Sequence, residues 1–170
     1  CNRDYRPYYE NMMMEKFYDT YKLCFGLGNL KRKLKMDMRI DELYDSNGLY
    51  RMYAQIIEIP IEICQLIKLH KLDLSDNQIT AIPSEIGQLV NLQELNLSYN
   101  QIIAIPSEIG QLVNLRELYL SANHITTIPS EIGQLVNLRV LYLSNNQITT
   151  ITSIASEIGQ LVNLQQPILP

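Results

Sequence analysis

The stretch that decides the fold runs from Leu92 to Leu115 and reads LQELNLSYNQIIAIPSEIGQLVNL. Its last nine residues, SEIGQLVNL, occur four times without change, at Ser84–Leu92, Ser107–Leu115, Ser130–Leu138 and Ser156–Leu164. The first three copies start 23 residues apart, and the fourth starts 26 residues after the third. Because self-similarity at such a period is typical of stacked repeats, the sequence predicts a solenoid.

The first half of the stretch carries the pattern L-x-x-L-x-L-S-x-N. Its leucines and asparagine recur as Leu69, Leu72, Leu74 and Asn77, then Leu92, Leu95, Leu97 and Asn100, then Leu115, Leu118, Leu120 and Asn123, then Leu138, Leu141, Leu143 and Asn146. Side chains alternate between the two faces of a strand, so the leucines of L-x-L are expected inside and the variable residues outside. Each asparagine is expected to close its strand and to bond backbone groups that no ladder reaches.

The segment after each asparagine returns apolar side chains to the interior, as Ile79, Ile82 and Ile86 do in the first full unit. Pro83, whose φ is preset for a helix start, is expected to open a short 3₁₀ or α segment that ends near Gly87–Leu89. One unit cannot bury its apolar edge alone, so the units must stack. The predicted fold class is an α/β repeat solenoid, a short horseshoe with a parallel β-sheet on its concave face and short 3₁₀ or α segments on its convex side.

These motifs resemble the 23-residue class of intracellular leucine-rich repeats and are similar to the Ras-group-related leucine-rich-repeat proteins of plants and animals. The resemblance extends from about Gln55 to Leu164. It implies the horseshoe fold and a scaffold or adaptor role in which another protein, such as a small GTPase or another signalling component, is bound. It names no particular partner.

The chain is expected to divide into three parts. Residues 1–54 form an N-terminal cap with a degenerate first repeat strand, residues 55–164 form the solenoid with four full repeats and one partial repeat, and residues 165–170 form a C-terminal tail. In the cap, Tyr8–Leu23 has the apolar spacing of an amphipathic helix. In the degenerate unit, Leu49 takes the place of a strand leucine, while Arg51 and Ala54 replace the next leucine and the asparagine.

Two departures stand near the C-terminus. Thr152–Ile154 is a three-residue insertion in the last unit, expected to bulge on the rim or the convex side. Pro167 stands where a strand leucine belongs, and it lacks the donor that a central strand needs. Two expectations stay open: this proline blunts the edge of the sheet, or the true cap is absent from this chain.

Composition excludes several classes of function. The formal charge of −4, from 14 basic and 18 acidic residues, predicts neither nucleic-acid nor membrane binding. The three cysteines, Cys1, Cys24 and Cys64, are widely spaced and lack a C-x-x-C pair, which favours a reducing compartment over a disulfide framework. The N-terminal residues are too polar for a signal peptide. A cytoplasmic protein is expected.

No arrangement of residues indicates catalysis, so we expect no enzyme activity, no catalytic residue, no cofactor and no metal site. His70 and His124 lie in different units without a nearby cysteine or second histidine. The repeated glutamates Glu85, Glu108, Glu131 and Glu157 form a column that could hold calcium, although a solvated surface is favoured because the like charges are stacked.

The outward strand positions differ between units, and we call this expected concave surface the sheet face. Neighbours in a parallel sheet are about 4.8 Å apart, so Tyr119 and Tyr142 should lie side by side, with Tyr99 near them. Tyrosine and arginine dominate interface energetics, which makes this surface the candidate binding site. The candidate partner-binding residues are Asp73, Glu94, Asn96, Tyr99, Arg116, Glu117, Tyr119, His124, Arg139 and Tyr142.

Three hypotheses of function remain open. In the first, the chain is a non-enzymatic interaction module that binds a protein through the sheet face. In the second, it is the recognition segment of a larger signalling enzyme, such as a kinase, a GTPase or a ubiquitin ligase, whose catalytic domain lies elsewhere. In the third, the variation on the sheet face is drift after recent duplication, without a defined partner. Weak self-association through the ends of the solenoid is a further expectation.

Overall fold

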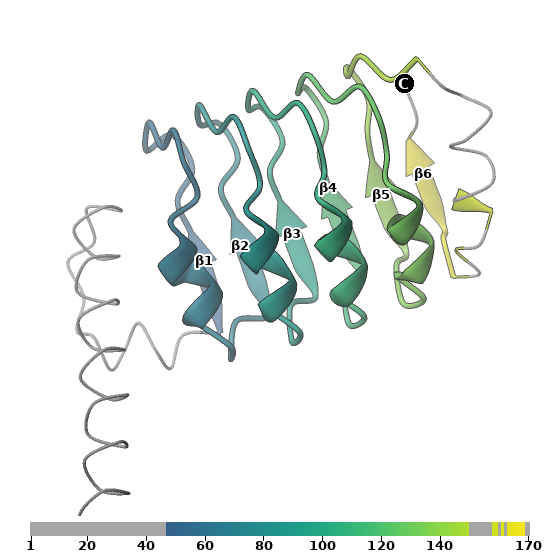
Figure 1. Ribbon diagram of the computed structural model, residues 1–170, viewed down its shortest axis with the longest axis horizontal. Helices are drawn as coiled ribbons and strands as arrows, with labels where there is room; N and C mark the ends of the chain where they lie inside the picture. Colours follow the sequence, from purple (N-terminus) through teal and green to yellow (C-terminus); the bar gives the residue numbers. More distant parts are fainter. Residues whose placement is uncertain (1–46, 150–157, 160, 162, 169–170) are drawn as a thin grey trace, which may run out of the picture.

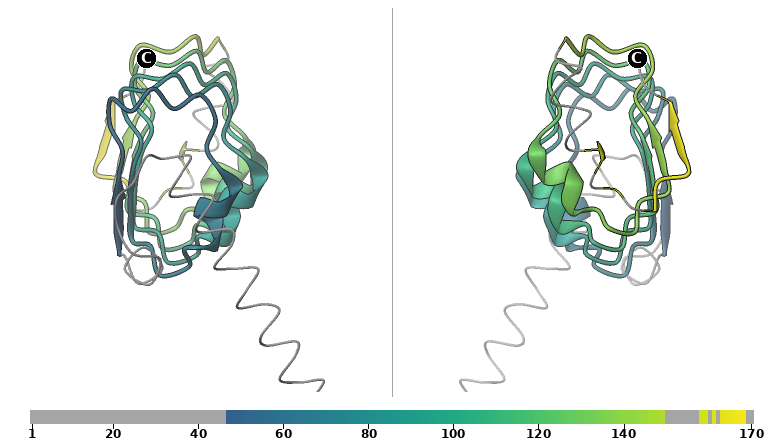
Figure 2. Two further views of the ribbon diagram at one scale, coloured as in Figure 1. Left: turned by 90° about the vertical axis from the view of Figure 1, so that its left-hand side faces the viewer. Right: turned by 90° about the vertical axis from the view of Figure 1, so that its right-hand side faces the viewer.

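The computed structural model describes residues 47–149, 158–159, 161 and 163–168 of the 170-residue chain. Successive coils of the chain stack in sequence order, and the first four coils each place a strand on one wall and a 3₁₀ segment on the opposite wall (Figures 1 and 2). The strands are β1 Gly48–Tyr50, β2 Lys71–Asp73, β3 Glu94–Asn96, β4 Glu117–Tyr119, β5 Val140–Tyr142 and β6 Gln166–Ile168. The 3₁₀ segments are η2 Ile61–Gln65, η3 Ser84–Gln88, η4 Ser107–Gln111 and η5 Ser130–Gln134.

All strand pairs in the described sheet are parallel, in the order β1-β2-β3-β4-β5-β6. This is the open sheet of a repeat solenoid, which confirms the predicted fold class. Parallel pairing follows from the repeat, because each unit returns the chain to the same point one strand further along.

The core is a continuous column of leucine and isoleucine between the two walls. The inward positions of the repeat are fully buried, as Leu95, Leu97 and Ile109 show with 0% exposure. Each buried leucine or isoleucine contributes about 1.5–3 kcal/mol when its side chain leaves water, so the stacking of coils supplies most of the stability. The assignment of inward and outward positions from the L-x-L pattern is therefore confirmed.

The predicted asparagine column spans the interior above the strands. The side-chain amide of Asn100 donates to the carbonyls of Leu74, Leu97 and Ser98 at 3.0–3.2 Å, and its Oδ1 accepts the N–H of Ile79 at 2.9 Å. Asn123 makes the same four bonds one coil further on. Each asparagine thus joins its own turn to the preceding coil, and it satisfies backbone groups that the three-residue strands leave without a partner.

The 3₁₀ segments begin directly after the proline, as the sequence predicts. Pro106, with φ −71° and ψ 151°, precedes η4 in extended conformation, and its carbonyl accepts the N–H of Ile109 at 3.1 Å. The segments pack closely against one another, which explains the repeated glycine. A Cβ atom added to Gly110 would lie 2.8 Å from the backbone oxygen of Glu131 and 2.9 Å from its Cβ.

The first unit is present in degenerate form. β1 pairs with β2 so that Leu49 lies opposite Leu72, which confirms Leu49 as a strand leucine. Ala54 stands in the asparagine register. Asn77 of the next coil accepts the N–H of Ile56 at 3.0 Å, as the later asparagines do for their preceding coils, and it also accepts the N–H of Ala54 at 3.0 Å. The predicted helix Tyr8–Leu23 and the insertion Thr152–Ile154 lie outside the described residues.

The last strand, β6, pairs with β5 so that Pro167 lies opposite Leu141. In the preceding strands, the N–H groups of Leu97 and Leu120 point to the following strand and donate to Tyr119 and Tyr142. By the alternation of the parallel ladder, the nitrogen of Pro167 faces away from β5, towards the outer edge. The proline therefore costs the ladder no bond and removes one donor from the edge of the described sheet. Within the described residues, no helix is both long and apolar enough to cross a membrane.

Candidate functional site

The outward side chains of the strands form two rows across the sheet face. The parallel registers place the first row as Lys71, Glu94, Glu117 and Val140, and the second row as Asp73, Asn96, Tyr119 and Tyr142. Because adjacent strands are about 4.8 Å apart, neighbours in a row touch. The registers are those expected from the 23-residue spacing.

The side chains over β2 and β3 bond mainly to one another. Lys71 Nζ lies 2.8 Å from Glu94 Oε2, and this hydrogen bond and the charge of Glu94 raise the pKa of Lys71. In the second row, the amide of Asn96 donates to Asp73 Oδ2 at 3.1 Å. The other oxygen of Asp73 accepts the N–H of Ser75 at 2.9 Å and its hydroxyl at 2.7 Å. The polar side chains in this half of the sheet face are therefore engaged with one another in two sets, Lys71 with Glu94, and Asp73 with Ser75 and Asn96.

The outward side chains of β4 and β5 are Glu117, Tyr119, Val140 and Tyr142, of which two are aromatic. The rings of Tyr119 and Tyr142 meet edge to face, with centroids 5.2 Å apart and planes at 81°. The Tyr119 hydroxyl donates to Glu117 Oε2 at 2.8 Å. Burial, followed by this hydrogen bond, raises the pKa of Tyr119 above its usual range, so the hydroxyl remains a neutral donor at physiological pH. Edge-to-face pairs are worth about 0.5–1.5 kcal/mol beyond the area that they bury, so the two rings hold each other in place.

Tyr99 lies just beyond β3, where the chain leaves the sheet. It has φ 56° and 62% exposure. Asp76, Ala122 and Asn145 occupy the same register and also have positive φ, so the left-handed conformation belongs to the turn of the repeat. A tyrosine in this conformation is unusual, because a β-carbon crowds the following carbonyl. The conformation aims the ring of Tyr99 into solvent at the carboxyl end of the strands.

Two further tyrosines of the sheet face were missed by sequence reasoning. Tyr50, 52% exposed, pairs in register with Asp73 of the second row, and Tyr53, 76% exposed, has the positive φ of the turn position. The signal was present, because each stands 23 residues before its counterpart, Asp73 or Asp76. The loss of the leucine and asparagine landmarks at Arg51 and Ala54 concealed it.

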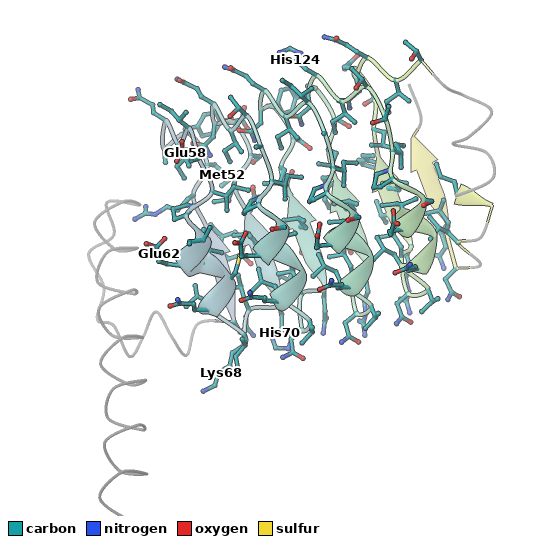
Figure 3. All side chains as sticks on the ribbon, in the orientation of Figure 1. Met52, Glu58, Glu62, Lys68, His70 and His124 are labelled. Atoms are coloured by element: carbon teal, nitrogen blue, oxygen red, sulfur yellow. The ribbon has the colours of Figure 1, made fainter. Side chains whose placement is uncertain are left out.

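Three of the candidate residues lie at the borders of the sheet face. Arg116 and Arg139 are exposed and directly precede β4 and β5, so they line the amino ends of the strands. His124 lies on the opposite rim, beyond the carboxyl ends, where its Nδ1 is 3.3 Å from the amide of Gln147. Figure 3 shows His124 at the upper edge of the solenoid and His70 at the lower edge. Six of the candidates, Asp73, Glu94, Asn96, Glu117, Tyr119 and Tyr142, therefore lie on the strands, Tyr99 lies in the turn after β3, and the other three lie at the borders.

Reactive side chains are scarce in the described part of the chain. Cys64 is 1% exposed and occupies the glycine register of η2, and burial together with the charge of Glu85 raises its pKa to about 12. A thiol with this pKa is a poor nucleophile at neutral pH. Among the described residues, no three histidine, cysteine or carboxylate side chains are grouped so as to hold a metal ion. The half-buried ring of His70 lies 2.7 Å from the carbonyl of Lys68, which gives it a local structural contact.

Residues 55–167 match the family described as the leucine-rich repeat region. The chain belongs to the leucine-rich-repeat family. No curated protein matches it. Solved leucine-rich-repeat structures align with most of its length, which agrees with the stacked coils and the asparagine column.

Three of these structures illustrate the likeness. The ectodomain of the plant membrane receptor kinase GASSHO1 from Arabidopsis thaliana, in complex with Casparian strip integrity factor 2, is 39% identical, with a TM-score of 0.69 over 76% of this chain and 16% of that one. Internalin C2 from Listeria monocytogenes is 30% identical, with a TM-score of 0.66 over 77% and 54%. A leucine-rich-repeat protein of Leptospira interrogans is 33% identical, with a TM-score of 0.62 over 78% and 40%. The leucine-rich-repeat protein described here thus spans about half or less of the length of each.

Proposed function

We propose that this leucine-rich-repeat protein is a non-enzymatic interaction module that binds another protein through its sheet face. The observation that carries the proposal is the tyrosine-rich surface over β4 and β5, held in place by the Tyr119–Tyr142 contact and the bond to Glu117. A ring that is already fixed loses little conformational entropy when a partner covers it. Related interaction modules support the proposal, since the GASSHO1 ectodomain was solved with a bound factor.

The proposal includes a cytoplasmic location and a scaffold or signalling role. The buried free thiol of Cys64 supports the location, because such a thiol persists in a reducing compartment. A net charge of −4 supports a partner other than nucleic acid or a membrane surface. The edge strand β6 is the place for weak self-association, which Pro167 would keep weak because it removes one edge donor.

A second candidate function is that of a recognition segment within a larger signalling enzyme, such as a kinase, a GTPase or a ubiquitin ligase. The observation that favours it is length, because the similar segment is only 16% of the GASSHO1 ectodomain chain, and that ectodomain belongs to a receptor kinase. Both candidates give the sheet face the same task, so the binding experiment comes first.

The test is affinity capture from a lysate of the cells that make the protein. The immobilised wild-type chain is compared with a variant that carries Tyr99→Ala, Tyr119→Ala and Tyr142→Ala. A control variant carries Glu85→Ala, Glu108→Ala and Glu131→Ala on the 3₁₀ wall, at the same number of coils. Thermal unfolding of all three proteins establishes that each is folded.

The expected result is one or more proteins retained by the wild type and by the control variant and lost from the tyrosine variant. Loss of a residue that anchors an interface typically costs more than about 1–2 kcal/mol, so three losses together should abolish capture. Equal retention by all three proteins would refute binding through the sheet face. Mass spectrometry of the retained protein then shows its class.

A further inference from the structure

We propose that the partner presents a basic, extended segment, one arginine or lysine of which lies against the Tyr119–Tyr142 ring pair and beside the carboxylate of Glu117. The inference rests on the proposed function and adds the chemistry of the partner. Four observations support it: the balance of charge on the strands, the surroundings of Glu117, the Tyr119–Tyr142 ring pair, and the position of the basic residues at the amino ends of the strands.

The balance of charge over the strands is acidic. The charged side chains of the two rows and of the adjoining turn are Lys71, Asp73, Asp76, Glu94 and Glu117. The single cation, Lys71, is engaged by Glu94 at 2.8 Å. Asp73 is engaged by Ser75 and Asn96, which are neutral donors. Even with Arg116 and Arg139 of the border counted, the sheet face carries more acidic than basic side chains, so a cationic segment is complementary to it.

Glu117 is the carboxylate placed to receive the cation. It lies between Glu94 and Val140 in the first row, so one neighbour adds a second negative charge and the other adds an apolar side chain. Its bond in the structure is to the Tyr119 hydroxyl, a neutral donor that leaves the charge of the carboxylate in place. Among the described residues, no cation forms an ion pair with Glu117. A partner guanidinium or ammonium would supply that missing charge.

The aromatic pair supplies the second half of the site. A cation within about 6 Å of a tyrosine ring is attracted by about 0.5–1 kcal/mol at an exposed site and by about 2 kcal/mol when it is desolvated. Tyr119 is half-buried and is held by Tyr142 on one side and by Glu117 on the other. The tyrosine ring and the carboxylate can therefore bind the same group of the partner. A planar guanidinium can stack on the ring of Tyr119 while it donates hydrogen bonds to Glu117.

Two arginines at the amino ends of the strands limit where the cation of the partner can lie. Arg116 and Arg139 precede β4 and β5 and repel a cation from the amino ends of these strands. A basic residue of the partner is therefore directed away from the amino ends, to the space between Glu117 of the first row and Tyr119 of the second row. Unfavourable contacts of this kind contribute to specificity as much as favourable ones do.

The test uses the full 170-residue chain, immobilised, and a phage-displayed library of random twelve-residue peptides, with enriched peptides then synthesised and measured by fluorescence anisotropy. The expected result is enrichment of peptides with arginine or lysine beside apolar residues. Glu117→Gln, which keeps the bond from Tyr119, should weaken their binding by roughly tenfold, and higher salt should weaken wild-type binding. Glu108→Gln, the same neutralisation on the opposite wall, should leave it unchanged.

Charge reversal provides the second arm. Glu117→Arg should lose the basic peptides and, in a fresh selection, enrich acidic ones. Acidic or neutral peptides that depend on Tyr119 and Tyr142 in the wild type would overturn the inference while leaving the proposed function intact. Basic peptides that bind Glu117→Gln as tightly as wild type would also overturn it. If no peptide depends on any sheet-face residue, both the inference and binding through the sheet face fail.

Discussion

Each coil combines residues that recur unchanged from coil to coil with the outward strand residues of the sheet face, which differ from coil to coil. The repeated part consists of the leucine and isoleucine core, the asparagine column and the 3₁₀ wall, where Asn100 and Asn123 make the same four bonds and the SEIGQ segments are identical. On the sheet face, two neighbouring coils place Asn96 and Tyr119 in one register. The difference teaches that the segment whose residues bond or pack in the same way in every coil recurs unchanged, exposed positions included, whereas the outward positions of the strands vary.

The largest expected effect comes from breaking the asparagine column. Asn100→Ala removes three donated bonds and one accepted bond inside the solenoid. The carbonyls of Leu74, Leu97 and Ser98 each keep a second donor, whereas the buried N–H of Ile79 loses its partner. Since an orphaned buried group costs about 1–3 kcal/mol and each lost hydrogen bond about 0.5–1.5 kcal/mol, the free energy of unfolding should fall by about 3 kcal/mol or more. Urea denaturation followed by circular dichroism measures the loss.

Asn114→Ala is the matched control for that change. Asn114 belongs to the same set of coils, but its amide makes an exposed bond to the carbonyl of Val90. Its loss should cost less than about 1 kcal/mol. Comparable losses for the two variants would mean that the interior column does not differ from surface asparagines.

A smaller loss is expected from Gly110→Ala on the 3₁₀ wall. The added Cβ would meet backbone and Cβ atoms of Glu131 in the next coil at 2.8–2.9 Å, and neither can move without separating the coils. Overpacking of this kind costs about 1–3 kcal/mol. Ser107→Ala, on the exposed start of the same segment, should be nearly neutral, and the same urea experiment compares the two. Equal stability of Gly110→Ala and wild type would show that the spacing of the coils adapts freely.

The dependence of stability on alkaline pH tests the burial of the Cys64 thiol, which stands where the later repeats have glycine. The folded state holds the pKa of Cys64 at about 12, whereas an unfolded cysteine titrates near 8.5. The unfolded chain therefore loses this proton first, so the free energy of unfolding should fall as pH rises from about 9 towards 12. Urea midpoints over this range should show a shallower fall in Cys64→Ala, and identical slopes would contradict burial of the thiol.

The smallest expected effect is a gain in stability on the sheet face. Tyr99 has φ 56° and an exposed side chain, and asparagine tolerates this conformation better than tyrosine does. Tyr99→Asn should raise the free energy of unfolding by about 0.5–1 kcal/mol while weakening capture of the partner. Asp76→Asn, at the same turn position, should change stability little. A destabilised Tyr99→Asn would mean that the ring has a structural role.

Much of the fold could be predicted from the sequence because the same pattern of leucine, asparagine, isoleucine and proline recurs in several units. The inward leucines, the asparagine column, the start of each 3₁₀ segment at its proline and the strand leucine Leu49 were all predicted and are all found. The rows of the sheet face could also be predicted, since the register follows from the 23-residue spacing. Tyr50 and Tyr53 were missed because the landmarks of their unit have changed.

The sequence by itself determined the period, the parallel order of the strands and the division into inward and outward positions, because hydrophobic periodicity and stacking act locally and identically in each unit. Only the tertiary structure decided how the outward side chains interact. It paired Lys71 with Glu94, set Tyr119 edge to face on Tyr142, and placed His124 on the rim, away from the strands. These contacts depend on rotamers and on neighbours one coil away, which a pattern along the chain does not specify.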